Sequence, residues 1–168
     1  YEDLERESAA LGGALVDSSV GKGDRVGVYM DKSWEAIVAM LAASRIGAAY
    51  VNVNPQFKAP QVEYLVEDCD IRVMIGDTPK LEELGPKTVQ TAFYRGVRPE
   101  GHAARSYVDV AEALDGEGLG ESRKVSESDL GTILYTSGST GMPKGVATSQ
   151  RNVVVGAQIV STYLQNTS

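Results

Sequence analysis

Residues 135–146 have the sequence Tyr135-Thr136-Ser137-Gly138-Ser139-Thr140-Gly141-Met142-Pro143-Lys144-Gly145-Val146. The glycines of this stretch let the backbone turn tightly and approach a ligand, because a residue without Cβ adopts positive φ at no steric cost. Its hydroxyl side chains supply neutral donors, and its lysine supplies a positive charge. Free backbone N–H groups, hydroxyls and a cation are together what a triphosphate needs. The stretch therefore predicts a phosphate-binding loop.

The spacing of this loop excludes the P-loop of nucleoside triphosphatases, in which lysine follows glycine and precedes serine or threonine. Here Pro143 comes before Lys144 and Gly145 comes after it. A flexible linker rich in Gly, Ser and Thr is the other interpretation. It explains neither the Pro-Lys-Gly end nor the apolar run 132–135 that leads into the loop.

Hydrophobic periodicity predicts alternating helices and strands along the chain. Helices are expected over about 1–15, 34–46, 60–68, 78–84, 107–114 and 151–164. Strands are expected over about 25–30, 48–53, 71–75, 88–94, 130–135 and 145–148, the strand 130–135 being buried, and 116–128 is expected to be an exposed connection. Ser33 offers a helix cap and Gly47 a helix stop.

This alternation favours parallel pairing and a doubly wound α/β fold, with a mainly parallel sheet and flanking helices, in which residues 1–168 form a single unit. Ligands of such sheets bind beyond the carboxyl ends of the strands, where the loop after Tyr135 falls.

Composition narrows the class of protein. A chain of 168 residues with 42% hydrophobic residues suffices for one ordinary core, and its apolar runs are too short to cross a membrane. A net charge of −7 argues against nucleic acid as a partner. The single cysteine, Cys69, is expected in the core, and with no visible signal peptide it favours the cytoplasm. The lone His102 lacks metal-ligand neighbours at useful spacing, so we expect no metal site on protein side chains.

The pattern aromatic-Thr-Ser-Gly-Ser/Thr-Thr-Gly-x-Pro-Lys-Gly resembles the signature loop of the adenylate-forming superfamily. This superfamily comprises acyl-CoA and aryl-CoA synthetases, amino-acid adenylation domains of nonribosomal peptide synthetases, and luciferase. The stretches 21–26, 46–51 and 129–130 are also similar to the N-terminal half of these enzymes. The resemblance thus covers nearly the whole chain and implies a fragment of the large N-terminal adenylation domain.

The rest of that domain and a mobile C-terminal domain would then be absent. Because the chain begins at Tyr1 rather than Met, it is expected to be a deliberately cut piece, a proteolytic fragment or the ordered part of a longer protein. The fragment alone is expected to be inactive. It is also expected to expose apolar surface, which the remainder of the enzyme or an oligomer partner would cover.

The resemblance implies an AMP-forming acyl-CoA ligase, which converts ATP and a carboxylic acid into an acyl-adenylate and pyrophosphate, then forms a thioester with CoA. Asn54-Pro55 is more similar to acyl-CoA ligases than to adenylation domains that load the phosphopantetheine of a carrier protein. The sequence does not distinguish CoA from a carrier protein as the acceptor. It also leaves acyl, aryl and amino acids as alternative substrates. A non-catalytic nucleotide-binding α/β module is the alternative of another class.

The resemblance also implies roles for the loop residues. Four hydroxyl groups and the loop amides would bind the β- and γ-phosphates of ATP. The hydroxyls are those of Thr136, Ser137, Ser139 and Thr140. Gly138 and Gly141 permit close approach, and Lys144 is the catalytic residue that neutralises the departing pyrophosphate, aided by Mg²⁺ carried with ATP. Gln150 occupies a position where relatives often have His. It would either help to line the pocket for the acid or serve only as the first residue of a helix.

Overall fold

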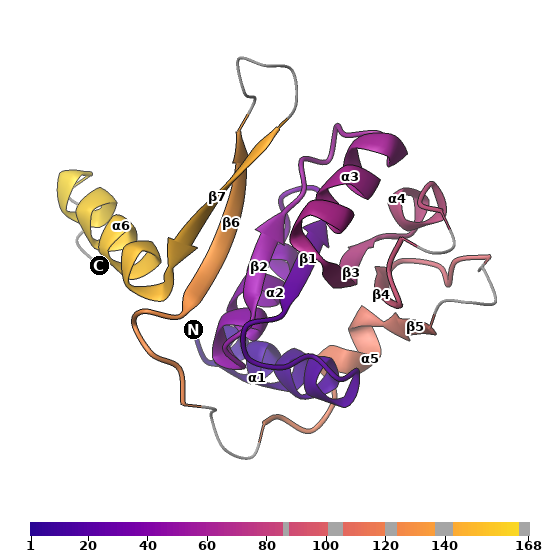
Figure 1. Cartoon of the computed structure of the whole chain (residues 1–168). Helices are drawn as coiled ribbons and strands as arrows, with labels where there is room; N and C mark the ends of the chain where they lie inside the picture. The colour runs from indigo at the N-terminus through magenta and orange to yellow at the C-terminus, as the bar shows by residue number, and fades with distance from the viewer. Residues whose placement is uncertain (86–87, 101–105, 120–123, 137–142, 165–168) are drawn as a thin grey trace.

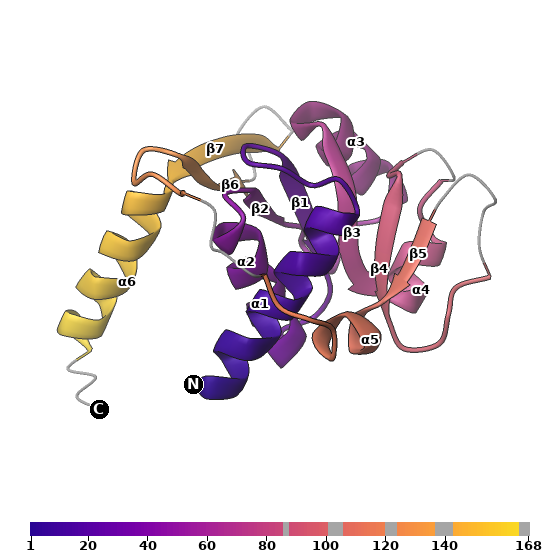
Figure 2. The same cartoon turned by 90° about the horizontal axis from the view of Figure 1, so that it is seen from below.

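The computed structural model describes residues 1–85, 88–100, 106–119, 124–136 and 143–164, which form a seven-stranded sheet with helices on both faces (Figures 1 and 2). The strand order is β5-β4-β3-β1-β2-β6-β7. Neighbouring strands are parallel except for β6 and β7, which are antiparallel. The predicted doubly wound, mainly parallel α/β fold is confirmed.

The elements follow the predicted alternation for most of the chain. The strands are β1 (Arg25–Tyr29), β2 (Ala49–Asn52), β3 (Ile71–Asp77), β4 (Thr91–Arg95), β5 (Ser106–Asp109), β6 (Leu130–Thr136) and β7 (Lys144–Ser149). The helices are α1 (Glu2–Asp17), α2 (Trp34–Arg45), α3 (Ala59–Cys69), α4 (Thr78–Glu82), α5 (Val110–Leu114) and α6 (Gln150–Tyr163).

Both ends of α2 form as the sequence predicts. Ser33 caps its start, the hydroxyl oxygen accepting the Ala36 N–H at 3.2 Å. At its end Gly47 has φ +76° and donates to the Ser44 carbonyl at 3.1 Å, while the N–H of Ala48 reaches the Ala43 carbonyl at 3.0 Å. These two bonds define a Schellman motif, so the chain turns sharply into β2.

Two hydrophobic cores lie on opposite faces of the sheet. On one face α1, α2 and α5 pack against β1, β3 and β4 through buried side chains such as Leu11, Val38 and Phe93. On the other, α3 and α4 cover the sheet through residues such as Leu65, Met74 and Leu81. Because β1 and β3 are covered on both sides, their residues are nearly all buried, as expected for central parallel strands.

Two segments differ from the prediction. The stretch expected to be one helix over 107–114 is the edge strand β5 followed by the short α5, because Tyr107 and Val108 pair with Ala92 and Phe93 of β4. An aromatic and a β-branched residue suit a strand once an edge is available. Likewise β4 begins only at Thr91, three residues later than the predicted Thr88.

The strand β6 is less buried than expected. Only Thr132 and Ile133 pair with Tyr50 and Val51 of β2. Beyond them β6 pairs with β7 alone, so Leu134 is 44% exposed. The antiparallel β6–β7 pair therefore extends past the sheet as a ribbon (Figure 1).

The helix α6 leads away from this ribbon and buries none of its residues (Figure 2). Its exposed apolar side chains include Val154, Ile159, Val160 and Tyr163. The exposed apolar surface that the sequence predicts is thus found on this helix. Among the described residues, no helix is long and apolar enough to cross a membrane.

Candidate active site

The predicted phosphate loop leaves the sheet at the carboxyl ends of the parallel strands. β6 runs parallel to β2 and ends at Thr136, and β7 begins at Lys144. Thr136 and Lys144 are direct partners in the antiparallel register, and both are exposed. The fold therefore sets a hydroxyl opposite an ammonium group at the mouth of the loop. Ser137, Gly138, Ser139, Thr140 and Gly141 lie outside the described residues.

The helix α3 contacts both stems of the loop. The Tyr135 hydroxyl donates to a carboxylate oxygen of Asp68 and lies 2.8 Å from the Cys69 sulfur. The Tyr64 hydroxyl donates to the Pro143 carbonyl over 3.5 Å. Burial, followed by the hydrogen bond to Asp68, raises the pKa of Tyr135 far above its ordinary value, so this phenol stays a neutral donor.

Cys69 is buried, as the sequence predicts. Burial raises the pKa of its thiol, and the hydrogen bond with Tyr135 only partly opposes this. The sulfur is therefore a protonated packing group rather than a nucleophile.

The opposite end of the ribbon is fixed by Asp129. Its carboxylate lies 2.6 Å from the Lys22 ammonium and accepts the Ser126 N–H at 2.6 Å. The hydrogen bond from Lys22, then that from Ser126, lowers the pKa of Asp129. The Asp129 carbonyl accepts the N–H of Gln150 at 2.9 Å, which ties the start of β6 to the start of α6.

A network of charges that sequence reasoning missed occupies the carboxyl edge beside β1. The Arg95 guanidinium donates to Asp77 at 2.7 Å and to Glu35 at 2.9 Å. Burial raises the pKa of Glu35, but hydrogen bonds from its own backbone, Ser33 and Arg95 outweigh it and lower the pKa overall. The hydrogen bond to Asp77 raises the pKa of Arg95. Arg95 directly follows the predicted strand 88–94 and Asp77 comes two residues after the predicted strand 71–75, which is the only signal the sequence offers.

Residues 1–167 of the chain match the family of AMP-binding enzymes. The chain belongs to this family. The match extends over both faces of the sheet as well as the β6–β7 ribbon, so it does not rest on the loop alone. The resemblance drawn from the signature loop is thereby confirmed.

Relatives of this AMP-binding chain include an acetyl-coenzyme A synthetase and a syringomycin synthase. It is 32% identical to acetyl-coenzyme A synthetase 2 of Candida albicans, over 98% of this chain and 27% of that protein. It is also 32% identical to syringomycin synthase SyrB1 of Pseudomonas syringae pv. syringae, over 91% of this chain and 23% of that protein.

Among solved structures, ATP-bound MatB from Rhodopseudomonas palustris superimposes with a TM-score of 0.83 at 27% identity. The match covers 99% of this chain and 33% of MatB. The AMP-binding chain thus spans about a quarter to a third of these three proteins.

Gln150 is the first residue of α6 in this AMP-binding chain. Ser149 before it caps the helix by accepting the Asn152 N–H at 3.3 Å. Gln150 is half-buried, and its side-chain nitrogen is buried without a hydrogen-bond partner among the described residues. It lines a hollow of about 380 Å³ with residues such as Glu127, Val154 and Val155. The helix-start role is confirmed, and an acid-pocket role stays a prediction.

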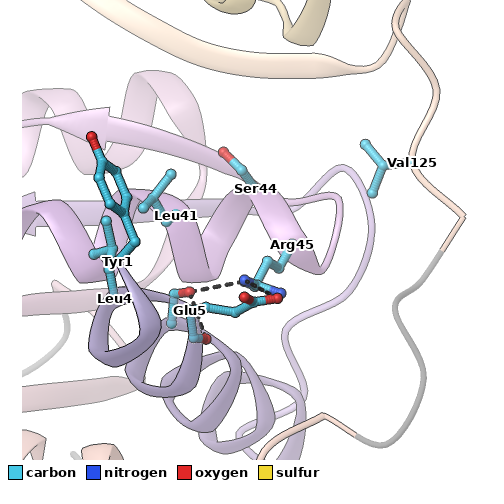
Figure 3. Close-up of a pocket in the computed structure, with 8 residues that line it drawn as sticks. Tyr1, Leu4, Glu5, Leu41, Ser44, Arg45 and Val125 are labelled. Atoms are coloured by element: carbon cyan, nitrogen blue, oxygen red, sulfur yellow. Dashed lines mark hydrogen bonds and ion pairs between the residues drawn. The ribbon is translucent and has the colours of Figure 1, made fainter. Parts of the chain in front are cut away.

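Two further hollows lie at opposite edges of the sheet. One of about 640 Å³ lies at the carboxyl ends of β1 and β2, between Met30, Ile37 and Asn54 among others. The other, about 630 Å³, lies between the start of α1 and the end of α2 (Figure 3). There Arg45 donates to Ser8 at 2.8 Å and pairs with Glu5 at 3.8 Å, so its charge is already matched. Only the first hollow lies at the edge where ligands bind such sheets.

The described residues contain no group of three or more His, Cys, Asp or Glu side chains that could hold a metal ion. His102 lies outside the described residues.

Proposed function

We propose that this chain is part of the N-terminal adenylation domain of an AMP-forming acid–thiol ligase, and that the acceptor thiol is CoA. The observation that carries the proposal is the pairing of Thr136 with Lys144 at the mouth of the loop, on the carboxyl edge of a doubly wound sheet. Hydroxyls, loop amides and an ammonium group form a donor set that fits a triphosphate.

In the first half-reaction the carboxylate of the acid attacks the α-phosphorus of ATP, forming the acyl-adenylate and releasing pyrophosphate. The hydroxyls of Thr136, Ser137, Ser139 and Thr140 bind the β- and γ-phosphates, and Gly138 and Gly141 let the backbone approach them. Lys144 offsets the charge that develops on the leaving pyrophosphate, and this offset is the chain's own catalytic contribution. In the second half-reaction the thiol attacks the acyl carbon and AMP leaves.

The availability of Lys144 supports this role. Within the described part of the chain its ammonium group makes no ion pair, and the side chain is exposed. Lysine binds phosphate as a mobile point charge and can follow the pyrophosphate as it departs.

A carrier protein is the second candidate acceptor, because a syringomycin synthase is as similar to the chain as an acetyl-CoA synthetase. Asn54-Pro55 favours CoA. The acceptors are separated by supplying the protein, at its full length, with ATP, its acid and either CoA or a carrier protein bearing phosphopantetheine. Thioester on CoA alone supports the first proposal, and thioester on the carrier alone replaces it with the second.

The acid itself is found by ATP–pyrophosphate exchange across a panel of fatty, aromatic and amino acids. Exchange that depends on one class of acid names the substrate class. Nucleotide binding without exchange for any acid would instead favour a non-catalytic binding module.

The 168 residues alone are expected not to catalyse the overall reaction, because they span about a third or less of the matched proteins. We expect no acyl-adenylate above background when the isolated chain is incubated with ATP, Mg²⁺ and the acid. The control is the full-length protein under the same conditions. Adenylate formation by the isolated chain would contradict this expectation.

A further inference from the structure

The phosphate loop stands on a ribbon that the sheet supports only at its base. The backbone of β6 pairs with β2 at Thr132 and Ile133, whereas at Tyr135 and Thr136 it pairs only with β7. An isolated two-stranded ribbon is marginally stable in water. The position of Lys144 therefore depends on whatever else holds the ribbon.

Tyr135 joins the two strands of the ribbon next to Lys144. Its ring lies against Gly145, where an added Cβ would come within 3.2 Å of the ring carbon that bears the hydroxyl. The same Cβ would come within 3.0 Å of Ile133. A side chain at position 145 would press against this ring and against Ile133, so the glycine allows the two strands to pack closely here.

The ring is in turn held by α3. Tyr64 and Asp68 are four residues apart and so lie on one side of the helix. Tyr64 bonds the Pro143 carbonyl on the stem that enters β7, and Asp68 bonds the Tyr135 hydroxyl on the stem that leaves β6. One helix face thus contacts both stems of the loop.

The helix is itself anchored to the sheet. Buried side chains of α3, such as Val62 and Leu65, pack against the second core. At its end Arg25 of β1 donates to the Cys69 carbonyl and pairs with Asp70 at 2.5 Å. A continuous series of contacts therefore runs from β1 through Arg25 and α3 to Tyr135 and the loop.

We propose that Asp68 and Tyr64 are positioning residues for adenylation, which hold both stems of the phosphate loop, and with them Lys144, at a fixed place above the carboxyl edge. This inference rests on the function proposed above. Because a fixed loop loses less conformational freedom when nucleotide binds, loss of either contact weakens ATP binding before it affects the fold.

The test uses Tyr135→Phe, Asp68→Asn and Tyr64→Phe in the full-length protein, each of which removes one polar group or charge and keeps the side-chain shape. Binding of a fluorescent ATP analogue with Mg²⁺ is measured without turnover, and the KM for ATP is measured in pyrophosphate exchange. Deuterium exchange of the amides in 133–136 and 144–147 reports directly on the ribbon.

We expect Tyr135→Phe to weaken nucleotide binding and raise the KM for ATP about tenfold, the usual effect of losing a hydrogen bond to a charged group. Asp68→Asn should have a smaller effect in the same direction, because its amide oxygen can still accept from the Tyr135 hydroxyl but carries no charge. The double variant should bind nucleotide no more weakly than Tyr135→Phe alone, since Asp68 acts on the loop through that phenol. Tyr64→Phe should have a smaller effect in the same direction, because its bond is long. Amide exchange in the ribbon should accelerate in all three.

The controls are Glu67→Gln, which removes one carboxylate from the exposed side of α3, and Tyr163→Phe, which removes an exposed phenol from α6. Neither should change nucleotide binding. Unchanged binding in Tyr135→Phe and Asp68→Asn, or an equal loss in the controls, would overturn the proposal. Faster amide exchange with unchanged binding would also overturn it, because the contact would then be structural only.

The experiments distinguish failure of the proposed ligase function from failure of the positioning role of α3. A wild-type protein that binds nucleotide but exchanges no pyrophosphate would refute the ligase, while the variants still decide from binding whether α3 positions the loop. A wild-type protein that binds no nucleotide would refute both.

Discussion

The ammonium group of Lys144 makes no ion pair among the described residues, in contrast to two arginines of the sheet. Arg95 is matched by Asp77 and Glu35, and Arg25 by Asp70. Arginine makes these fixed contacts because its planar fork suits carboxylates, whereas lysine is a mobile point charge. Arg95 and Arg25 thus fasten elements together, whereas Lys144 is available to a ligand.

The fastening role of Arg95 predicts a loss of stability in Arg95→Met. The substitution leaves two half-buried carboxylates without their cation, and we expect the free energy of unfolding to fall by about 1–2 kcal/mol at neutral pH. Urea unfolding measures it. Arg151→Met, on the exposed start of α6, is the control and should change stability by less than about 0.5 kcal/mol.

The same variant should lose its effect in acid. The pKa of Glu35 is lowered in the folded protein, so its contribution is present at neutral pH and disappears as the pH falls through that pKa. The stability difference between Arg95→Met and wild type should therefore shrink from about pH 5 to pH 3. A difference that stays constant over this range would show that the ion pair does not cause it.

The residues that the sequence allowed us to single out are those that act together with residues close to them in the chain. Thr136 and Lys144 belong to one short motif, and Ser33 and Gly47 act within one helix. Asp68 and Arg95 were missed because their partners lie many residues away in sequence and meet only when the sheet forms. A single carboxylate or guanidinium carries no local signal of such a contact.

At the scale of elements, the loop depends on how strands and helices end. The Schellman motif at Gly47 directs the chain from α2 into β2, and β2 is the strand that supports β6. The misassigned β5 shows the limit of local prediction, since residues 107–108 are a strand only because β4 offers an edge. The intrinsic propensity of its residues decides the secondary structure of a short segment only where no neighbouring strand is available for pairing.

The ending of α2 predicts opposite effects for two glycine substitutions. Gly47→Ala should reduce stability by about 1 kcal/mol, because alanine is strained at φ +76°. Gly156→Ala, inside the exposed α6 with nothing near the added Cβ, should have no cost and should favour the helix by up to about 1 kcal/mol. Thermal unfolding of both variants checks this. Equal destabilisation by the two would contradict the role assigned to Gly47.

At the scale of the whole molecule, the described chain has two well-covered sheet faces and one uncovered helix. α6 exposes Ile159 by 63% and Tyr163 by 85%. Apolar surface of this kind marks a contact with something else. We propose that another part of the enzyme, or an oligomer partner, covers it.

The uncovered helix predicts self-association of the isolated 168-residue chain. Replacing Val155 and Ile159 together by serine should shift it toward the monomer in sedimentation velocity, because both are exposed apolar residues of α6. Val97→Ser, an exposed apolar residue between β4 and β5, is the control. Association unaffected by the α6 pair but reduced by Val97→Ser would place the contact elsewhere.

We propose that this chain binds the pyrophosphate side of ATP in an adenylate-forming ligase, with Lys144 as the cation. The most direct test is acid-dependent ATP–pyrophosphate exchange by the full-length protein, compared between wild type, Lys144→Ala and the exposed-lysine control Lys124→Ala. We expect exchange in wild type and control, and a loss of about a hundredfold or more in Lys144→Ala with the melting temperature unchanged. Exchange at the wild-type rate in Lys144→Ala would contradict the claim.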